Sequence, residues 1–390
     1  MKSYKKAILK GLSRNILIVG LVSLFTDLSS QMVFPLIPLY LVTIGASAWV
    51  IGLVEGAAET TASFLKVFSG YLSDKIKKRK PFVLAGYSIS TFTKPLFAIA
   101  NIWPLVLIIR IIERIGKGIR NAPRDAIIAE SCDISCRGKA YGFHRAMDGI
   151  GSITGALIAF ILLPIIGFKN IFLIAVIPGI IAVLFIILIE EKRIETDNSK
   201  NKQTLKIGLK KLPLNLKLFL FVSIIFSFAH FGYAFILLKA KDIGLNDQYT
   251  IFLYVLYYIV YTLFIIPAGV LSDKIGRKPV IVTGYLLFSI TSIGLIFTNT
   301  NLLLLLMFIL YGCFYAMIDG VQRAFVVDLA PENLKATALG TYHTSIGLAA
   351  LPGGLLLGLI WDQISPEVMF AYALFLTLVS IFIISFIKKQ

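Results

Sequence analysis

The sequence GYLSDKIKKRKPFVLAGY occupies residues 70–87, and the closely related sequence GVLSDKIGRKPVIVTGY occupies residues 269–285. The two segments begin 199 residues apart in a chain of 390 residues. A weaker match relates IAE at residues 128–130 to VVD at residues 326–328, 198 residues further on. Self-similarity at a fixed offset predicts that the second half of the chain repeats the structure of the first.

Long apolar segments surround both copies of this sequence. The chain is 57% hydrophobic and only 15% charged, with a mean hydropathy of +0.86, whereas a soluble domain is about 25% charged. Apolar runs of 18 or more residues indicate membrane-spanning helices. We count twelve, called spans 1–12, near residues 16–40, 48–73, 81–100, 103–130, 140–166, 170–190, 217–239, 248–272, 279–298, 301–328, 337–360 and 366–387. This composition excludes a soluble enzyme and a disordered chain.

The distribution of charge predicts how the chain is oriented. The net charge of +17 comes from 38 Lys and Arg residues against 21 Asp and Glu residues, an excess that alone would suggest a nucleic-acid partner. However, these cations gather in both tails and in the loops after even-numbered spans, whereas the other loops carry few. Cytoplasmic loops hold the excess of Lys and Arg in membrane proteins. We therefore expect a multi-pass protein of the cell membrane with both termini in the cytoplasm and no nucleic-acid partner.

The repeat and the spans together predict the domain organisation. We expect an all-α membrane protein whose twelve transmembrane helices form two pseudo-symmetric six-helix bundles, at residues 1–190 and 217–390. A Lys-rich cytoplasmic linker at residues 191–216 would join them. Two related bundles that rock around a site near the membrane midplane produce alternating access, which is how many transporters work.

The duplicated loop, G-x-L-S-D-K-x-(G/K)-(R/K)-(R/K), resembles the signature loop of the major facilitator superfamily. This resemblance covers the whole chain and implies a transporter rather than an enzyme. An Asp that pairs with an Arg in one conformation and releases it in another would also act as a conformational latch; the alternative is a solvated basic turn. The first copy departs from the pattern at Lys77, where glycine is usual. The matching residues are Gly70, Asp74, Lys78 and Arg79 in the first copy and Gly269, Asp273, Gly276, Arg277 and Lys278 in the second.

Span 4 carries five cations on one helical face. They follow one another at spacings of i, i+4, i+7, i+10 and i+14, which places them within roughly 120° of the helix circumference. An Arg or Lys at the membrane centre costs about 2.5–3.5 kcal/mol, so this face must point at protein or at a water-filled cavity. The alternative for the last two is that they anchor the helix at its cytoplasmic end. The five residues are Arg110, Arg114, Lys117, Arg120 and Arg124.

Several other polar residues within the spans are candidates to line a substrate cavity. In the C-terminal half, four tyrosines of span 8 could stack on an aromatic substrate, although packing is an alternative for them and for the histidines. The full set of cavity candidates is Gln31, Arg114, Lys117, Arg120, Asn121, Arg145, Asp148, His230, Tyr233, Asp319 and Arg323, and the tyrosines are Tyr254, Tyr257, Tyr258 and Tyr261.

Four acids within the spans are candidates to carry a proton: Asp27, Glu55, Glu59 and Glu113. A buried carboxylate beside a cation can load and release a proton, because desolvation favours the neutral acid and the cation favours the charged form. A purely structural ion pair is the alternative for each. The position of Arg110 is similar to that of the span-4 arginine of proton-coupled superfamily members, which tunes a nearby acid; Arg114 is the competing match. The antiporter signature of span 5 is only partly present, at residues 151–155.

The favoured function is a secondary active transporter that exports a small organic solute in exchange for protons. An organic-anion or phosphate-ester carrier or exchanger that uses the span-4 cations is the alternative. A non-transporting receptor or a lipid scramblase is the alternative from another class. The sequence has no Walker loop, zinc-binding spacing or dinucleotide fingerprint. We therefore expect no enzymatic activity, no cofactor and no metal, and as partners a small-molecule substrate, protons and the lipid bilayer, with the protein acting as a monomer.

Overall fold

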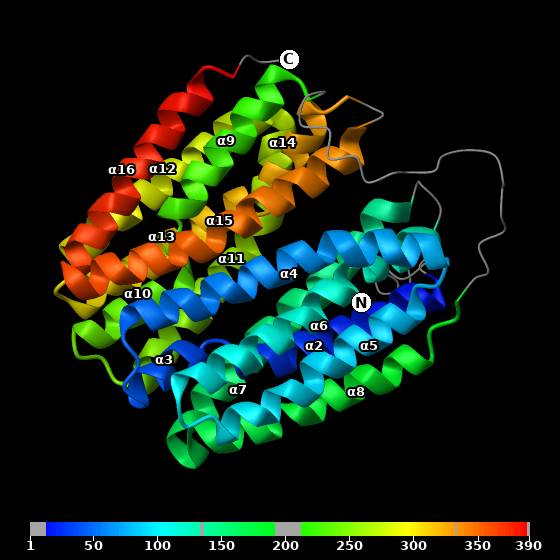
Figure 1. Ribbon diagram of the computed structural model, residues 1–390, viewed down its shortest axis with the longest axis horizontal. Coiled ribbons are helices and arrows are strands. Elements are labelled where there is room, and N and C mark those ends of the chain that lie inside the picture. The colour runs from blue at the N-terminus through cyan, green and yellow to red at the C-terminus, as the bar shows by residue number, and fades with distance from the viewer. Residues whose placement is uncertain (1–12, 133–135, 192–211, 332–333, 388–390) are drawn as a thin grey trace, which may run out of the picture. The chain divides into compact units, whose positions relative to one another are not determined.

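A computed structural model describes residues 13–132, 136–191, 212–331 and 334–387 (Figure 1). All regular structure within these ranges is helical. Most of the predicted linker, residues 192–211, and the basic segments at residues 1–12 and 388–390 lie outside the described residues.

The described residues form fifteen α-helices and one 3-10 helix, η1, and the shortest of them are parts of longer spans (Figure 1). The first half contains α2 (Arg14–Gln31), α3 (Leu36–Thr43), α4 (Ala48–Ile76), α5 (Lys80–Thr93), η1 (Lys94–Ile99), α6 (Trp103–Glu130), α7 (Arg137–Ile174) and α8 (Val176–Ile187). The second half contains α9 (Leu214–Ala229), α10 (Gly232–Asp242), α11 (Asp247–Ile275), α12 (Arg277–Ile296), α13 (Asn301–Ile318), α14 (Val321–Leu329), α15 (Lys335–Gln363) and α16 (Pro366–Ser385).

Nine helical stretches of the described chain are long and apolar enough to cross a membrane. One of them, Gly138–Ile187, covers both predicted spans 5 and 6. Inside it Gly167 adopts φ +70°, a conformation that glycine tolerates far better than other residues, and it interrupts the helical backbone between the two spans. Helices α4 and α6 are not among the nine, although both were predicted to span, and each carries several charged residues. The number of twelve spans stays a prediction.

The internal repeat extends to breaks in the helices. Span 1 is interrupted between α2 and α3, and span 7 is interrupted between α9 and α10. The break in span 7 contains His230 and is followed by Gly232, whose φ of +60° disfavours other residues. Backbone groups at such a break lack helical partners, and transporters place binding residues at positions of this kind. The fold therefore puts His230 at a structurally special point of its span.

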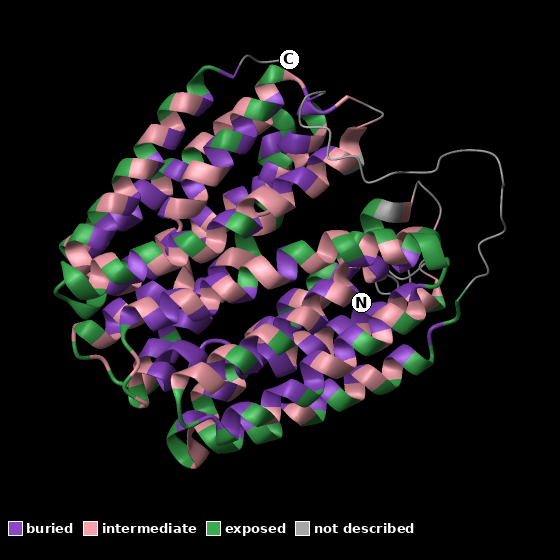
Figure 2. Cartoon of the chain, in the orientation of Figure 1, coloured by how far each residue is buried: buried purple, intermediate pink, exposed green. Residues whose placement is uncertain are grey.

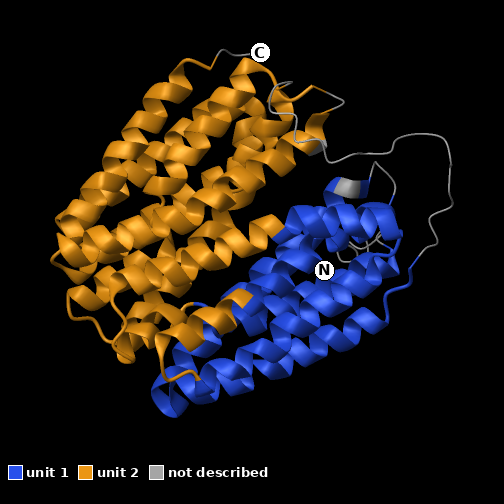
Figure 3. Cartoon of the chain, viewed as in Figure 1, with its two compact units in different colours: residues 1–34, 65–99, 112–202 blue, residues 35–64, 100–111, 203–390 orange. Residues whose placement is uncertain are grey.

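The helices form two compact units (Figure 3). Unit 1 comprises Met1–Phe34, Leu65–Ile99 and Ile112–Lys202, and unit 2 comprises Pro35–Phe64, Ala100–Ile111 and Gln203–Gln390. Spans 1, 2 and 4 thus contribute residues to both units. This division does not test the predicted domain boundaries at residues 190 and 217, which stay a prediction.

Each unit has its own apolar core, and buried positions alternate with exposed ones along the helices (Figure 2). In unit 1 the core joins α2, α5, α6, α7 and α8 through side chains such as Val19, Tyr87 and Ile128. In unit 2 it is aromatic, with Phe226 stacked 4.2 Å from Tyr285 and Phe288 packed 4.8 Å from Phe314. Many large apolar side chains are exposed on the outside, as expected for helices surrounded by lipid.

Candidate functional site

The first copy of the duplicated loop is organised by Arg79, which precedes α5. Its guanidinium lies 2.5 Å from Asp74 and 3.2 Å from Glu130, and it donates a 2.8 Å hydrogen bond to the Ser73 hydroxyl. Asp74 and Ser73 belong to the end of α4, and Glu130 closes α6. One buried arginine therefore ties together three helices of unit 1.

The second copy repeats this arrangement around Arg277, which begins α12. Its guanidinium pairs with Asp273 and lies 3.2 Å from Asp328, and it donates a 2.6 Å hydrogen bond to Ser272. We call each four-residue group a latch. The Asp and the Arg of each latch were predicted from the sequence. The serines and the second acids were not, although the serine stands in both loops and the second acids lie in the weaker match.

The lysine that follows each latch arginine donates hydrogen bonds to backbone carbonyl oxygens at the C-terminal end of another helix. Lys80 donates to the carbonyl oxygens of Ile187, the last residue of α8, and of Ile189, at 2.7 and 2.8 Å. Lys278 donates to those of Ser385, the last residue of α16, and of Ile387, at 2.8 and 2.7 Å. Lys80 therefore occupies the place that Lys278 has in the second copy, and a role for Lys78 stays a prediction.

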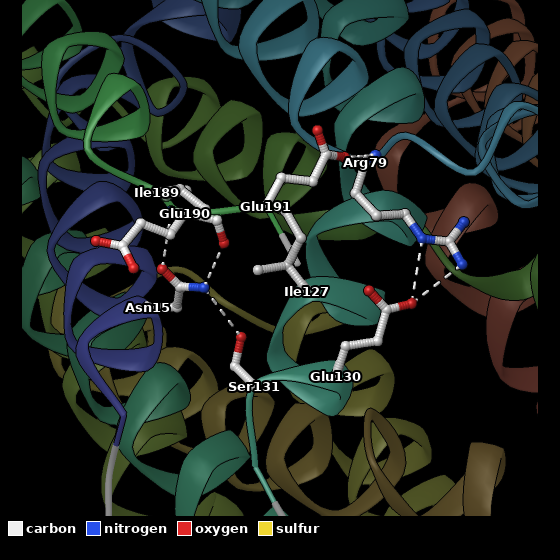
Figure 4. Close-up of a pocket in the computed structure, with 8 residues that line it drawn as sticks. All are labelled: Asn15, Arg79, Ile127, Glu130, Ser131, Ile189, Glu190 and Glu191. Atoms are coloured by element: carbon white, nitrogen blue, oxygen red, sulfur yellow. Dashed lines mark hydrogen bonds and ion pairs between the residues drawn. The ribbon is translucent and has the colours of Figure 1, made fainter. Parts of the chain in front are cut away.

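A small pocket beside the first latch is lined by six polar residues and two isoleucines, from α2, from α6 and the residue after it, from Arg79 and from the segment after α8 (Figure 4). Asn15 donates a 2.8 Å hydrogen bond to the carbonyl oxygen of Glu190, and Arg79 bonds to Glu130 across the pocket. The backbone N–H groups of Arg79 and Lys80 donate to the Glu191 carboxylate. These groups satisfy one another, so the pocket belongs to the latch rather than to a separate ligand site.

We expect Arg79→Ala and Arg277→Ala to slow transport by a similar factor, about tenfold, because each latch makes the same contacts and a conformational bias of 1–3 kcal/mol has effects of this size. Arg→Lys should restore little, since a point donor cannot bridge two acids. Initial transport rates of the reconstituted variants measure the effect. A large loss in only one of the two would contradict the equivalence of the latches.

Two predicted proton-coupling residues meet in unit 2. The fully buried Arg110 of α6 places Nη2 3.0 and 3.2 Å from the two carboxylate oxygens of Glu55 on α4. The Glu55 side chain is 22% exposed, whereas that of Arg110 is 0% exposed. Removing one partner of a buried ion pair typically costs about 3–5 kcal/mol. The sequence predicted an acid near Arg110 but did not say which one, and the structure shows that Glu55 is that neighbour.

The next turn of α4 carries Glu59, a third predicted coupling residue. Its side chain is exposed, and it accepts a 3.4 Å hydrogen bond from Ser63. His230 and Tyr315 both lie within electrostatic range of Glu59, and Tyr254 lies within range of Glu55. Glu55 and Glu59 are four residues apart on α4 and therefore lie on the same face of that helix.

Those aromatic residues form a tyrosine cluster on α10, α11 and α13. The Tyr311 hydroxyl lies 3.2 Å from His230 Nε2. Tyr261 donates a 2.9 Å hydrogen bond to Asp319, which also lies 3.0 Å from Arg323. The structure thus brings together four predicted cavity residues, His230, Tyr233, Asp319 and Arg323. The members of the cluster are Tyr233, Tyr254, Tyr257, Tyr258, Tyr261, Tyr311 and Tyr315.

Four of the five span-4 cations, from Arg114 to Arg124, lie in unit 1, and three of them contact side chains of that unit. Arg114 stacks on Phe34, 4.7 Å from the ring centroid, and lies 3.5 Å from Glu113. Arg120 stacks on Tyr87 at 4.4 Å and donates to Ser90. Cation–π stacking of this kind stabilises a desolvated guanidinium. Arg124 pairs with its neighbour Asp125 at 2.8 Å. The remaining cavity candidates of unit 1, Gln31, Lys117 and Asn121, are buried or half-buried.

Asp148 of α7 is surrounded by polar and basic side chains in unit 1. Ser23 of α2 donates to Asp148, and His144 and Arg145 lie 3.4 and 3.7 Å from it. Asp27 has Asp148, Lys117, Arg120 and Arg124 as charged neighbours. All of these residues except Ser23 and His144 were named from the sequence, and the i, i+4 spacing to Asp148 could have indicated the histidine. No cluster of three His, Cys, Asp or Glu side chains that could hold a metal occurs among the described residues.

Helices α4 and α15 approach closely in unit 2 at the end where α4 begins. The carboxylate of Asp362 accepts hydrogen bonds from the backbone N–H groups of Ala48 and Trp49, at 3.0 and 2.7 Å, and so caps α4. Along the same contact a Cβ on Gly354 would lie 2.5 Å from the Gly52 carbonyl oxygen. Only glycine permits this approach of two backbones. We call this contact the α4–α15 closure.

Comparison with known proteins identifies relatives over the whole chain. The family model described as Major Facilitator Superfamily matches residues 19–240 and 218–389. A protein of Methanocaldococcus jannaschii, described as an uncharacterized MFS-type transporter, is 41% identical over 384 residues, which cover 96% of this chain and 95% of the relative.

Solved structures show the same fold at low identity. A mutant of the nucleoside transporter NupG superimposes with a TM-score of 0.80 and 18% identity, covering 96% of this chain and 100% of the other. A D-xylose-proton symporter superimposes with a TM-score of 0.77 and 17% identity, covering 96% and 97% of the two chains. At these identities the likeness extends to the fold alone.

Proposed function

The chain belongs to the Major Facilitator Superfamily, whose members are transporters and not enzymes, and on this premise we propose that it exports a small organic solute in exchange for protons. The observation that carries the coupling proposal is the Glu55–Arg110 ion pair. It joins a partly exposed acid to a fully buried cation inside a multi-pass membrane protein. From the distribution of basic residues in the loops, we further propose that both termini are cytoplasmic. We also propose that the protein acts as a monomer.

The proposed mechanism uses Glu55 as the proton carrier. Its charged form is held by Arg110, so the pair is neutral overall and suited to a low-dielectric site. When Glu55 binds a proton the pair is broken, and the buried guanidinium must turn to other acceptors. Two protonation states then favour two arrangements of α4 and α6. A proton bound on one side of the membrane and released on the other drives alternation between them.

The alternative proton carrier is Asp27 together with Asp148. Two carboxylates near one another cannot both ionise easily, so such a pair tends to share one proton. The hydrogen bond from Ser23 and the nearby His144 offer a path for that proton. In the organic-anion alternative the span-4 guanidiniums would grip the substrate. It has weaker support, because Arg110, Arg114 and Arg120 already contact acids, hydroxyls or rings of this chain.

Flux measurements in proteoliposomes test the proposal. An inward-directed proton gradient should drive accumulation or release of a solute from a broad panel of organic cations, neutral compounds and anions, and a protonophore should abolish it. Purified protein that moves no solute under any gradient would instead favour a receptor. Movement of labelled phospholipid between leaflets without solute flux would favour a scramblase.

A further inference from the structure

We propose that the first copy of the duplicated loop binds the headgroup of an anionic phospholipid through Lys75, Lys77 and Lys78, which we call the lysine group. The partner is a lipid of the surrounding membrane rather than the transported solute. The inference therefore goes beyond the proposed function and does not depend on it.

The charges of the lysine group have no protein partner in the described part of the chain. All three side chains are exposed, and none of them takes part in an ion pair or a hydrogen bond there. The acids at this end of unit 1 are engaged elsewhere. Asp74 and Glu130 pair with Arg79, and Glu191 accepts backbone N–H groups. The lysine group therefore presents three positive charges that are available to an anion.

The backbone at Lys77 shows that the loop keeps a lysine at a strained position. Lys77 has φ +58° and is the one non-glycine residue with a positive φ among the described residues. The second copy is one residue shorter and has Gly276, with φ +96°, at the same turn. A side chain disfavours this backbone conformation, whereas glycine adopts it freely. Strained residues of this kind gather where proteins bind ligands or switch conformation.

The end of α4 supplies an apolar surface next to the lysine group. Phe68 is 54% exposed and Tyr71 is 36% exposed. With Lys75 they follow one another at i, i+3 and i+7, which places all three on one face of the helix. Lysine stems lie along apolar surface with their ammonium groups in the headgroup layer, and tyrosine is common at the same depth. The acyl chains of a lipid can contact the two rings while its phosphate lies on the lysines.

The local charge favours an anionic lipid over a zwitterionic one. Five of the six residues at positions 75–80 are cations, and an anion beside them reduces their mutual repulsion. In the proposed orientation the loop faces the cytoplasmic leaflet, where anionic lipids attract Lys and Arg next to membrane-spanning segments. The second copy has Lys274 but no counterpart of Lys77 and Lys78, so we expect weaker binding there.

Native mass spectrometry of the purified full-length protein, with equal amounts of phosphatidylglycerol and phosphatidylcholine, tests the proposal. Phosphatidylglycerol should bind at least about tenfold more tightly, because each lysine near an anionic membrane surface contributes about fivefold. Soluble glycerophosphate at constant ionic strength should not displace the lipid, since the acyl chains also bind. Equal binding of the two lipids, or displacement by glycerophosphate, would overturn the proposal.

Matched substitutions in the two copies assign the binding to the lysine group. Lys75→Gln and Lys274→Gln remove equivalent lysines, and phosphatidylglycerol affinity should fall about fivefold in the first and less than about twofold in the second. Lys77→Gln combined with Lys78→Gln should lower it more than about tenfold, whereas Arg at both positions keeps the charge and should retain the affinity. An equal loss in Lys75→Gln and Lys274→Gln would show a general attraction to basic surface and refute the assignment.

Lys77→Gly separates binding from folding. This variant removes one charge and gives the turn the residue that the second copy has, so its melting temperature should stay the same or rise. Its affinity for phosphatidylglycerol should nevertheless fall about fivefold. Wild-type affinity in Lys77→Gly would contradict the proposed contact with Lys77.

Discussion

Glu55→Gln is expected to lower proton-driven flux on the order of 100-fold or more, the effect expected when a group that transfers protons is lost, while exchange of labelled for unlabelled substrate continues. Glutamine has the shape of the protonated acid but cannot release a proton. The variant therefore mimics the protonated state of Glu55 permanently. Exchange needs only the conformational change and the substrate, whereas accumulation needs the proton to be released. The two rates are measured in the same proteoliposomes, with and without a pH gradient.

Three variants control this experiment. Glu55→Asp keeps a titratable group and should retain part of the gradient-driven flux. Asp27→Asn removes the other candidate carrier in unit 1 and should retain gradient-driven flux if Glu55 is the carrier. Arg110→Lys keeps the charge but loses the fork that contacts both carboxylate oxygens, so an intermediate loss is expected. Full gradient-driven flux in Glu55→Gln, combined with its loss in Asp27→Asn, would transfer the role to the Asp27–Asp148 group.

Gly354→Leu is expected to abolish the α4–α15 closure and to reduce transport by more than tenfold. Even a Cβ at this position would lie 2.5 Å from the Gly52 carbonyl oxygen, and side chains do not approach backbone atoms so closely. The helices must separate, at a cost of about 1–3 kcal/mol for overpacking, and Asp362 would lose its hydrogen bonds to the start of α4. Conformational bias of this size changes populations by an order of magnitude or more.

The protein carries its own reporter of this closure. Its three tryptophans are Trp49 on α4, Trp103 on α6 and Trp361 on α15, and the first two are in edge contact at 5.5 Å. Separation of α4 from α15 should expose them and shift their fluorescence to longer wavelength. Gly142→Leu, at a glycine with open space around it, is the matched control and should leave the spectrum unchanged. A wild-type spectrum and rate in Gly354→Leu would show that the closure does not limit transport.

Local sequence was sufficient to predict that an Asp pairs with an Arg in each copy of the duplicated loop. Asp74 and Arg79 stand five residues apart in a motif that occurs twice, and the structure shows the same pairing in both copies. The second acids, Glu130 and Asp328, were harder to identify because they close distant helices. Their positions 198 residues apart were visible in the weaker repeat, but nothing in the spacing indicated that each faces an arginine.

The pairing of Glu55 with Arg110 could not have been predicted from the sequence. Arg110 and Glu55 are 55 residues apart, and four acids were equally plausible partners. Periodicity places the cations of span 4 on one face of the helix, but neighbouring helices determine what that face meets. Arg114 and Arg120, whose role in a substrate cavity stays a prediction, stack on Phe34 and Tyr87. These rings carry no charge, so no charge pattern in the sequence indicated the contacts.

Amino-acid order alone establishes that this chain is a helical membrane protein built on a repeat. Backbone groups in lipid must satisfy one another, so long apolar segments have to become helices, and duplicated motifs fold into duplicated local contacts. Packing between helices settles which acid neutralises which cation and which rings gather around His230. Those contacts depend on how helices that are distant in the chain are rotated and how closely they approach. The spacing of residues along a single helix does not determine either quantity.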